Sequence, residues 1–191
     1  ELQHVIADTK ARCRMACSSD DESKHNDKCT AWLPPPVHGE YTIAVCSDLH
    51  YGSKHALPGA ISDWFAWARA HGAMLGVCAG DVVAGAYDFL AYELTAHGAR
   101  EQAYVVAEAL PRAHNFMWHF IDGNHDYTHE KKTGYPFGET LVDVFARSGR
   151  TDLNYLGPRN ATLKLGLSGT GNSVQLELWH PGGGGLNPLT P

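Results

Sequence analysis

Phe-Ile-Asp-Gly-Asn-His-Asp-Tyr, residues 120–127, is the stretch that decides the fold. An apolar run from Asn115 to Ile121 stops abruptly at Gly-Asn-His-Asp, residues 123–126. This pattern predicts a buried strand that delivers three polar side chains to its carboxyl end, where open α/β folds build their sites. A reacting group is therefore expected at this strand end.

Two earlier stretches and one later stretch repeat the same design. Residues 41–47 lead into Asp-Leu-His, residues 48–50, and residues 74–79 lead into Gly-Asp, residues 80–81. A further apolar stretch, residues 174–179, ends at His180. Each predicted strand therefore ends in a side chain that can bind a metal ion.

Helical segments are expected between these strands. Residues 61–70 and 101–108 have helical patterns, ended by Gly72 and Pro111, and residues 138–148 are predicted to form another helix. Residues 161–167 and 173–179 have the pattern of a hairpin. On the first helix, the aromatic side chains at positions 64, 65 and 67 are expected to pack in the core or on the helix face rather than to bind a ligand.

Asp-x-His, Gly-Asp, Gly-Asn-His-Asp and a strand-terminal His, in this order, are the motifs of the metallophosphoesterase (calcineurin-like phosphoesterase) superfamily. The sequence resembles this family from about residue 41 to residue 185, and its phage and bacterial-type members in particular. The resemblance implies an α/β fold, a four-layer α/β/β/α sandwich with mixed sheets. We expect an N-terminal extension at 1–40, a metallophosphoesterase domain at 41–185 and a tail at 186–191.

The resemblance also implies a centre for two divalent metal ions. Asp48 and His50 would bind the first ion, Asp81 would bridge both, and Asn124 and His180 would bind the second. Carboxylate, amide-oxygen and imidazole ligands suit Mn²⁺, which we expect, or Fe or Zn²⁺, better than Ca²⁺. Taken singly, each residue also fits a cap, loop or turn position, but their joint occurrence in family order favours the site.

The reaction implied by the resemblance is metal-dependent phosphoester hydrolysis by a phosphatase or phosphodiesterase, with a metal-bridging hydroxide as nucleophile. His125 would be the general acid that protonates the leaving alkoxide, and Asp126 would be its orienting partner carboxylate. The substrate would be a phosphorylated small molecule or a nucleotide or nucleic-acid phosphodiester. The substrate specificity of the enzyme is expected to depend on the loops at 51–59, 85–94 and 127–137.

The sequence departs from the family pattern after His180. Family members carry a further Gly-His-x-His motif whose two histidines complete the two metal ions, and no histidine follows His180 here. We therefore expect a chain cut short before that motif, with a fold incomplete at its C-terminus and weaker metal binding. The alternative function is a catalytically weak or inactive scaffold or binding protein of the same fold, although the retained His125 and Asp126 argue against it.

Length and composition bound the remaining possibilities. A chain of 191 residues with 43% hydrophobic and 19% charged residues fits one globular domain with a short extension. A net charge of −6 argues against a general nucleic-acid or anionic-membrane surface, but a metal centre would still admit a phosphorylated substrate. Without an apolar run of membrane length or a signal-peptide pattern, we expect a cytoplasmic protein with no membrane partner. The oligomeric state stays open.

The first 40 residues differ in composition and pattern from the rest of the chain. Cys13, Cys17, His25 and Cys29 could hold a structural zinc ion, but their spacing matches no common zinc finger well, so a partly ordered arm is favoured. Zinc-dependent nucleic-acid binding by this segment is disfavoured by the acidic balance. The five cysteines are an odd number and form no disulfide framework.

Overall fold

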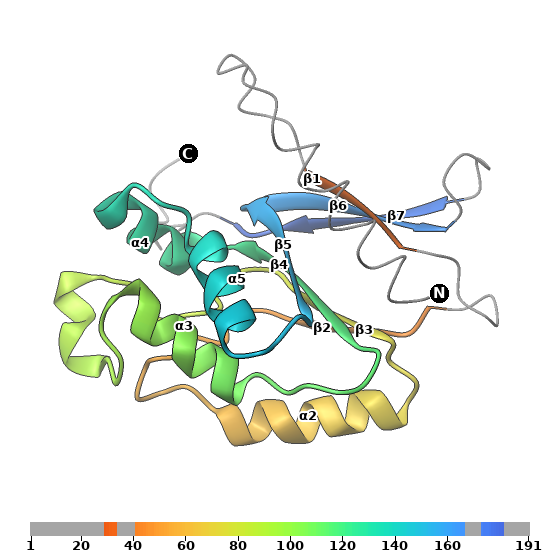
Figure 1. Cartoon of the computed structure of the whole chain (residues 1–191), viewed down its shortest axis with the longest axis horizontal. Helices are drawn as coiled ribbons and strands as arrows, with labels where there is room; N and C mark the ends of the chain where they lie inside the picture. The colour runs from red at the N-terminus through yellow and green to blue at the C-terminus, as the bar shows by residue number, and fades with distance from the viewer. Residues whose placement is uncertain (1–28, 34–40, 167–172, 182–191) are drawn as a thin grey trace, which may run out of the picture.

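The computed structural model describes residues 29–33, 41–166 and 173–181 of the chain (Figure 1). The predictions made for residues 1–28, 34–40 and 182–191 lie outside these ranges. Within them, no helix has both the length and the apolar character needed to cross a membrane.

Four short strands form a fully parallel sheet in the order β2-β3-β4-β5. They are β2 (Ile43–Cys46), β3 (Leu75–Cys78), β4 (Met117–Asp122) and β5 (Leu153–Pro158). Because parallel neighbours need long crossover connections, helices separate successive strands along the chain. These are α2 (Pro58–Ala70), α3 (Gly98–Ala109), α4 (Asn124–Thr133) and α5 (Phe137–Arg147), with a short 3₁₀ helix, η1 (Asp88–Glu93), before α3.

A second sheet has the order β1-β6-β7. Its strands are β1 (Cys29–Leu33), β6 (Asn160–Gly166) and β7 (Ser173–Trp179). This sheet is mixed, since β1 runs parallel and β7 antiparallel to β6. Figure 1 shows the second sheet on one side of the parallel sheet and the helices on the other.

The two faces of the parallel sheet pack against different layers, because side chains alternate along a strand. Trp118 and Phe120 of β4 face the helices, where they share a core cluster with Phe65 of α2. Ile121 faces the other way and packs in a second cluster with Leu163 of β6. The described residues therefore form three layers: helices, parallel sheet and mixed sheet.

This architecture confirms the predicted α/β fold, with one correction of detail. Only the three-stranded sheet is mixed, whereas the site-bearing sheet is purely parallel. None of the helices in the described ranges contributes to the cluster between the sheets. The fourth layer and the incomplete C-terminus therefore remain predictions.

The predicted elements of the parallel sheet are confirmed with small shifts of their ends. The strands expected at 41–47, 74–79 and 115–121 are β2, β3 and β4, and the expected hairpin is β6 and β7. The helices expected at 61–70, 101–108 and 138–148 are α2, α3 and α5.

The aromatic side chains of α2 divide between the core and the helix face, as predicted. Phe65 is buried, but the Trp67 side chain is 61% exposed and lies against the His71 ring, with 4.2 Å between ring centroids. Because Trp67 stands two positions from Phe65, the helix turn carries it to the solvent side.

Candidate metal centre

The predicted site residues meet at the carboxyl edge of the parallel sheet. Asp48 and His50 follow β2, Asp81 follows β3, and Asn124 opens α4 just after β4. His180 arrives from β7 of the other sheet. The structure therefore brings together all five proposed ligands from four strand ends that are far apart in the sequence.

Three of these residues have left-handed backbone conformations. The φ angles are 54° at Asp48, 46° at His50 and 52° at Asp81. Aspartate and histidine enter this region more readily than most residues, but each such position still costs about 1–3 kcal/mol. Backbone hydrogen bonds hold the two loops together, with the Asp48 N–H donating to the Gly80 carbonyl at 3.0 Å and the His50 N–H to the Asp81 carbonyl at 3.1 Å. The loops therefore hold strained backbone that aims these side chains at one point.

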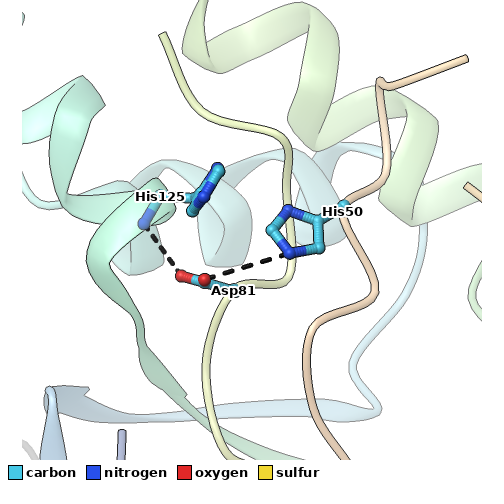
Figure 2. Close-up of side chains that lie close together, drawn as sticks. All are labelled: His50, Asp81 and His125. Atoms are coloured by element: carbon cyan, nitrogen blue, oxygen red, sulfur yellow. Dashed lines mark hydrogen bonds and ion pairs between the residues drawn. The ribbon is translucent and has the colours of Figure 1, made fainter. Parts of the chain in front are cut away.

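Asp81 is the centre of the cluster. Its side chain is only 4% exposed, and its Oδ2 lies 3.4 Å from His180 Nε2 and 4.0 Å from His50 Nε2. Its Oδ1 accepts the backbone N–H of His125 at 2.8 Å, and Figure 2 shows the carboxylate between the two histidines it contacts there. Two groups that could each hold a cation, His50-Asp81-His125 and Asp48-Asp81-His180, share this carboxylate.

The surroundings of His180 fit a positively charged ion. His180 Nδ1 lies 2.8 Å from the Ala79 carbonyl, which can only accept, so Nδ1 carries the proton. The lone pair of Nε2 then points at two further acceptors, Asn124 Oδ1 at 2.9 Å and Asp81 Oδ2 at 3.4 Å. The amide nitrogen of Asn124 faces the Tyr87 hydroxyl instead, at 3.4 Å. Either a proton on Nε2 or a metal ion among these atoms satisfies this arrangement, and a carbonyl-bound Nδ1–H is the usual support of a metal-binding histidine.

His50 is also suited to bind a metal ion. Burial, and then the neighbouring His125, lower the pKa of His50 below its ordinary value, which favours the neutral ring that can donate a lone pair. The rings of His50 and His125 meet edge to face, with 4.4 Å between centroids. His125 therefore stands beside the ligands, within reach of anything bound to them.

The predicted contact between His125 and Asp126 is not present. The ring nitrogen Nδ1 of His125 donates to the Ala84 carbonyl at 2.7 Å. The Asp126 carboxylate is fully buried and accepts the backbone N–H groups of Gly123, Val82 and Val83 at 2.8, 3.2 and 3.0 Å. As α4 starts at Asn124, successive side chains leave in directions about 100° apart, so Asp126 faces the core while His125 faces the site.

Asp126 thus has a different task from the one predicted. It joins the loop after β3 to the N-terminus of α4, where an anion and free N–H groups complement each other. Burial raises the pKa of Asp126 to about 6, and the N–H groups of Gly123 and Val83 lower it. The residue therefore fixes the position of the His125 backbone without touching its ring.

Two further residues support the site and were not found by sequence reasoning. Tyr87 places its ring 4.8 Å from the His125 ring, centroid to centroid. Gln102, fully buried on α3, accepts the Gly85 N–H at 3.0 Å and donates to the Gly85 carbonyl at 2.9 Å, which fixes the chain next to Ala84. Tyr87 lies in one of the predicted specificity loops, but no local pattern distinguishes Gln102 from any other helical glutamine.

The comparisons with known proteins agree with this geometry. A protein-family model described as calcineurin-like phosphoesterase matches residues 41–181. The match includes every proposed ligand as well as His125 and Asp126. Comparison with curated proteins and with solved structures gives no significant match.

Proposed function

The chain belongs to the calcineurin-like phosphoesterase family, and from this premise we propose that it hydrolyses phosphoesters at a centre for two divalent metal ions. The observation that carries the proposal is the sharing of Asp81 by two potential cation groups. Both His50 Nε2 and His180 Nε2 lie near the same carboxylate oxygen, Oδ2, which would therefore face both sides of such a centre. The proposal extends to Mn²⁺ as the preferred ion, because the donor set combines oxygen with imidazole nitrogen.

The proposed ligands divide around Asp81. The proposed division differs from these two groups: Asp48 and His50 would bind one ion and Asn124 and His180 the other, which leaves His125 to act as the acid. Ions bound there would neutralise charge on the phosphoryl oxygens and acidify a water molecule. The chain itself supplies the ligand directions, through the strained backbone at Asp48, His50 and Asp81.

His125 is the proposed general acid. Its Nδ1 is occupied by the Ala84 carbonyl, so Nε2 is the nitrogen available to hand a proton to the leaving oxygen. The backbone N–H of the same residue is held by Asp81 at 2.8 Å. The acid and the central ligand are therefore fixed to each other, which limits the movement of the proton donor relative to a bound phosphoryl group.

The alternative is a scaffold of the same fold that binds metal ions but has little or no activity. The absence of a carboxylate on the His125 ring favours it, because a neutral carbonyl stabilises an imidazolium less than a negative charge does. The geometry of the metal ligands suits both functions, so turnover is the measurement that separates them.

The test is hydrolysis of p-nitrophenyl phosphate and bis-p-nitrophenyl phosphate with added Mn²⁺, together with Mn²⁺ binding by calorimetry. We expect turnover that chelation abolishes. His125→Ala should lower kcat by about 10²–10⁴-fold with Mn²⁺ affinity nearly unchanged. Asp81→Asn should weaken Mn²⁺ binding, because it removes the only charge that both ions share.

Two exposed residues provide matched controls. His114→Ala and Asp63→Asn make the same chemical changes on the surface and should leave turnover and Mn²⁺ binding as in the wild type. Bound Mn²⁺ without hydrolysis of either ester would support the scaffold. Failure to bind Mn²⁺ at all would contradict both functions.

A further inference from the structure

A cavity of about 440 Å³ opens beside the candidate metal centre. Asp48, His50 and His125 form part of its wall, so whatever fills it lies next to the proposed acid. This volume is within the range of small-molecule sites in proteins. The rest of the wall comes from the loop after β2, the first turns of α2 and the η1 segment.

Most of this remaining wall is apolar. Leu57 and Ile61 line it from α2, and Leu90 and Leu94 from η1. The Leu57 side chain is 69% exposed and therefore has apolar surface that a bound ligand could cover. An apolar ligand group would gain most of its binding energy by covering these side chains.

The charged groups of the wall are unevenly distributed. Away from the metal ligands, the cavity contains Glu93 and His55, whose Oε2 and Nε2 lie 4.0 Å apart. None of the lysines and arginines in the described ranges lines it. A carboxylate has several lone pairs, so Glu93 can accept a hydrogen bond from a ligand in addition to its contact with His55. The cavity therefore favours a hydrogen-bond donor or a cation over a second anion.

The cavity is held in shape by contacts between its two loops. The Lys54 N–H donates to the Glu93 carbonyl at 2.8 Å, and the Thr95 N–H donates to the Gly52 carbonyl at 2.8 Å. Lys54 Nζ also donates to the Tyr92 carbonyl at 2.6 Å. A preformed wall saves the entropy of ordering loops on binding.

We propose that this cavity receives the leaving group of the phosphoester, and that the preferred leaving group is a flat, aryl-sized apolar alcohol that is neutral or cationic at its far end. The inference rests on the proposed function, because it places the leaving oxygen beside His125. It assigns Leu90 and Glu93 as specificity-determining residues. Esters whose leaving group carries a second phosphate are disfavoured, because Glu93 would repel them.

The test measures binding of non-hydrolysable phosphonates to the Mn²⁺-loaded full chain by calorimetry. Naphthylmethylphosphonate should bind at least about fivefold more tightly than benzylphosphonate, because of its additional apolar area. Benzylphosphonate with a para-aminomethyl group should bind about tenfold more tightly than its para-carboxyl analogue, because a neighbouring carboxylate attracts one charge and repels the other. The same ratios are expected in kcat/KM for the corresponding aryl phosphates.

Two variants test which residue causes each of these affinity ratios. Leu90→Asn should remove the preference for the naphthyl group, and Glu93→Gln should remove the charge preference. Phe89→Asn changes a 71% exposed neighbour that does not line the cavity, and Glu139→Gln changes an exposed glutamate on α5, so both should leave the ratios as in the wild type.

The outcomes separate this inference from the proposed function. Equal affinities for all phosphonates, tighter binding of the carboxyl analogue, or no phosphonate binding would overturn the inference even if p-nitrophenyl phosphate is hydrolysed. The expected affinity ratios without hydrolysis of any ester would instead refute the hydrolase and retain the ligand class.

Discussion

Gly123 shows how much one methyl group can matter at this site. A Cβ at this position would lie 2.1 Å from Asp81 Oδ1 and 2.4 Å from the Asp81 backbone nitrogen. Gly123→Ala should therefore displace the central ligand, destabilise the fold by about 1–3 kcal/mol through overpacking and weaken Mn²⁺ binding. Calorimetry and urea unfolding would measure the two effects.

Gly59 is the matched position, because a Cβ there meets nothing within 4 Å. Gly59→Ala lies in the first turn of α2 and should be neutral or slightly stabilising, since alanine is the better helix former. Gly59→Ala should leave Mn²⁺ affinity unchanged. If Gly123→Ala left it unchanged as well, Asp81 would not be the shared ligand.

Residue identities at the site could be predicted better than residue roles. The strand-end positions of Asp48, Asp81 and Asn124 follow from the sequence pattern, because parallel strands bring their carboxyl ends to one edge, whereas His180 reaches the site from the mixed sheet. The separate tasks of His125 and Asp126 do not follow from it. They depend on whether the chain continues from Gly123 as a loop or, as found, as a helix that turns neighbouring side chains apart.

At the level of elements, one buried arginine ties α3 to the start of β5. Arg150 donates to the Ala107 and Leu110 carbonyls at the end of α3, each at 2.8 Å, and pairs with Asp152 through two hydrogen bonds of 2.9 and 2.6 Å. Arg150→Leu should lower the free energy of unfolding by about 3 kcal/mol, because a largely buried carboxylate and two carbonyls lose their partner. Urea unfolding monitored by circular dichroism would check this value.

The exposed pair of Arg147 and Asp143 on α5 is the comparison. Its side chains are 60% and 51% exposed, so Arg147→Leu should lower the free energy of unfolding far less than Arg150→Leu does. Equal effects of the two substitutions would mean that Arg150 holds the elements together no more strongly than a surface ion pair.

The elements that sequence reasoning missed lack a local apolar pattern. α4 reads Asn-His-Asp-Tyr-Thr-His-Glu-Lys-Lys-Thr and has no apolar stripe, so no helical period is visible. It forms because Asp126 and Asp81 accept the N–H groups of Gly123 and His125 at its start, and the left-handed Gly134 ends it. β1 pairs with β6, more than a hundred positions away, and such non-local pairing leaves no mark on the short segment itself.

For the molecule as a whole, His119 makes stability depend on pH. It is buried in β4, and burial lowers its pKa to about 4 from an ordinary value of 6.5. Between these values the unfolded chain binds more protons, so the stability contributed by neutral His119 is complete above about pH 6.5 and is lost as pH falls towards 4. The loss amounts to about 3 kcal/mol at most.

His119→Gln isolates this contribution. Asp126, with its raised pKa of about 6, changes stability in the opposite direction over part of the same range, so the difference between variant and wild type is the informative quantity. Urea unfolding between pH 4 and 7 should show a stability gap that shifts in favour of the variant as pH falls. The exposed His114→Gln should show no such shift.

Fold class was predictable at this scale because β2, β3 and β4 are apolar runs with polar ends, whereas β5 (Leu-Asn-Tyr-Leu-Gly-Pro) lacks this pattern and was not predicted. In the mixed sheet, only the hairpin of β6 and β7 could be predicted, because it has a local sequence pattern. The third strand, β1, has no such pattern.

The origin of His180 in the second sheet has a mechanical consequence. Asp48, His50, Asp81 and Asn124 belong to the parallel sheet and its connections, whereas His180 follows β7 and its backbone N–H donates to the Arg159 carbonyl just before β6. An ion held by Asp81, Asn124 and His180 would cross-link the parallel sheet and the mixed sheet. By mass action, its affinity would then be coupled to the free energy that keeps the layers from parting.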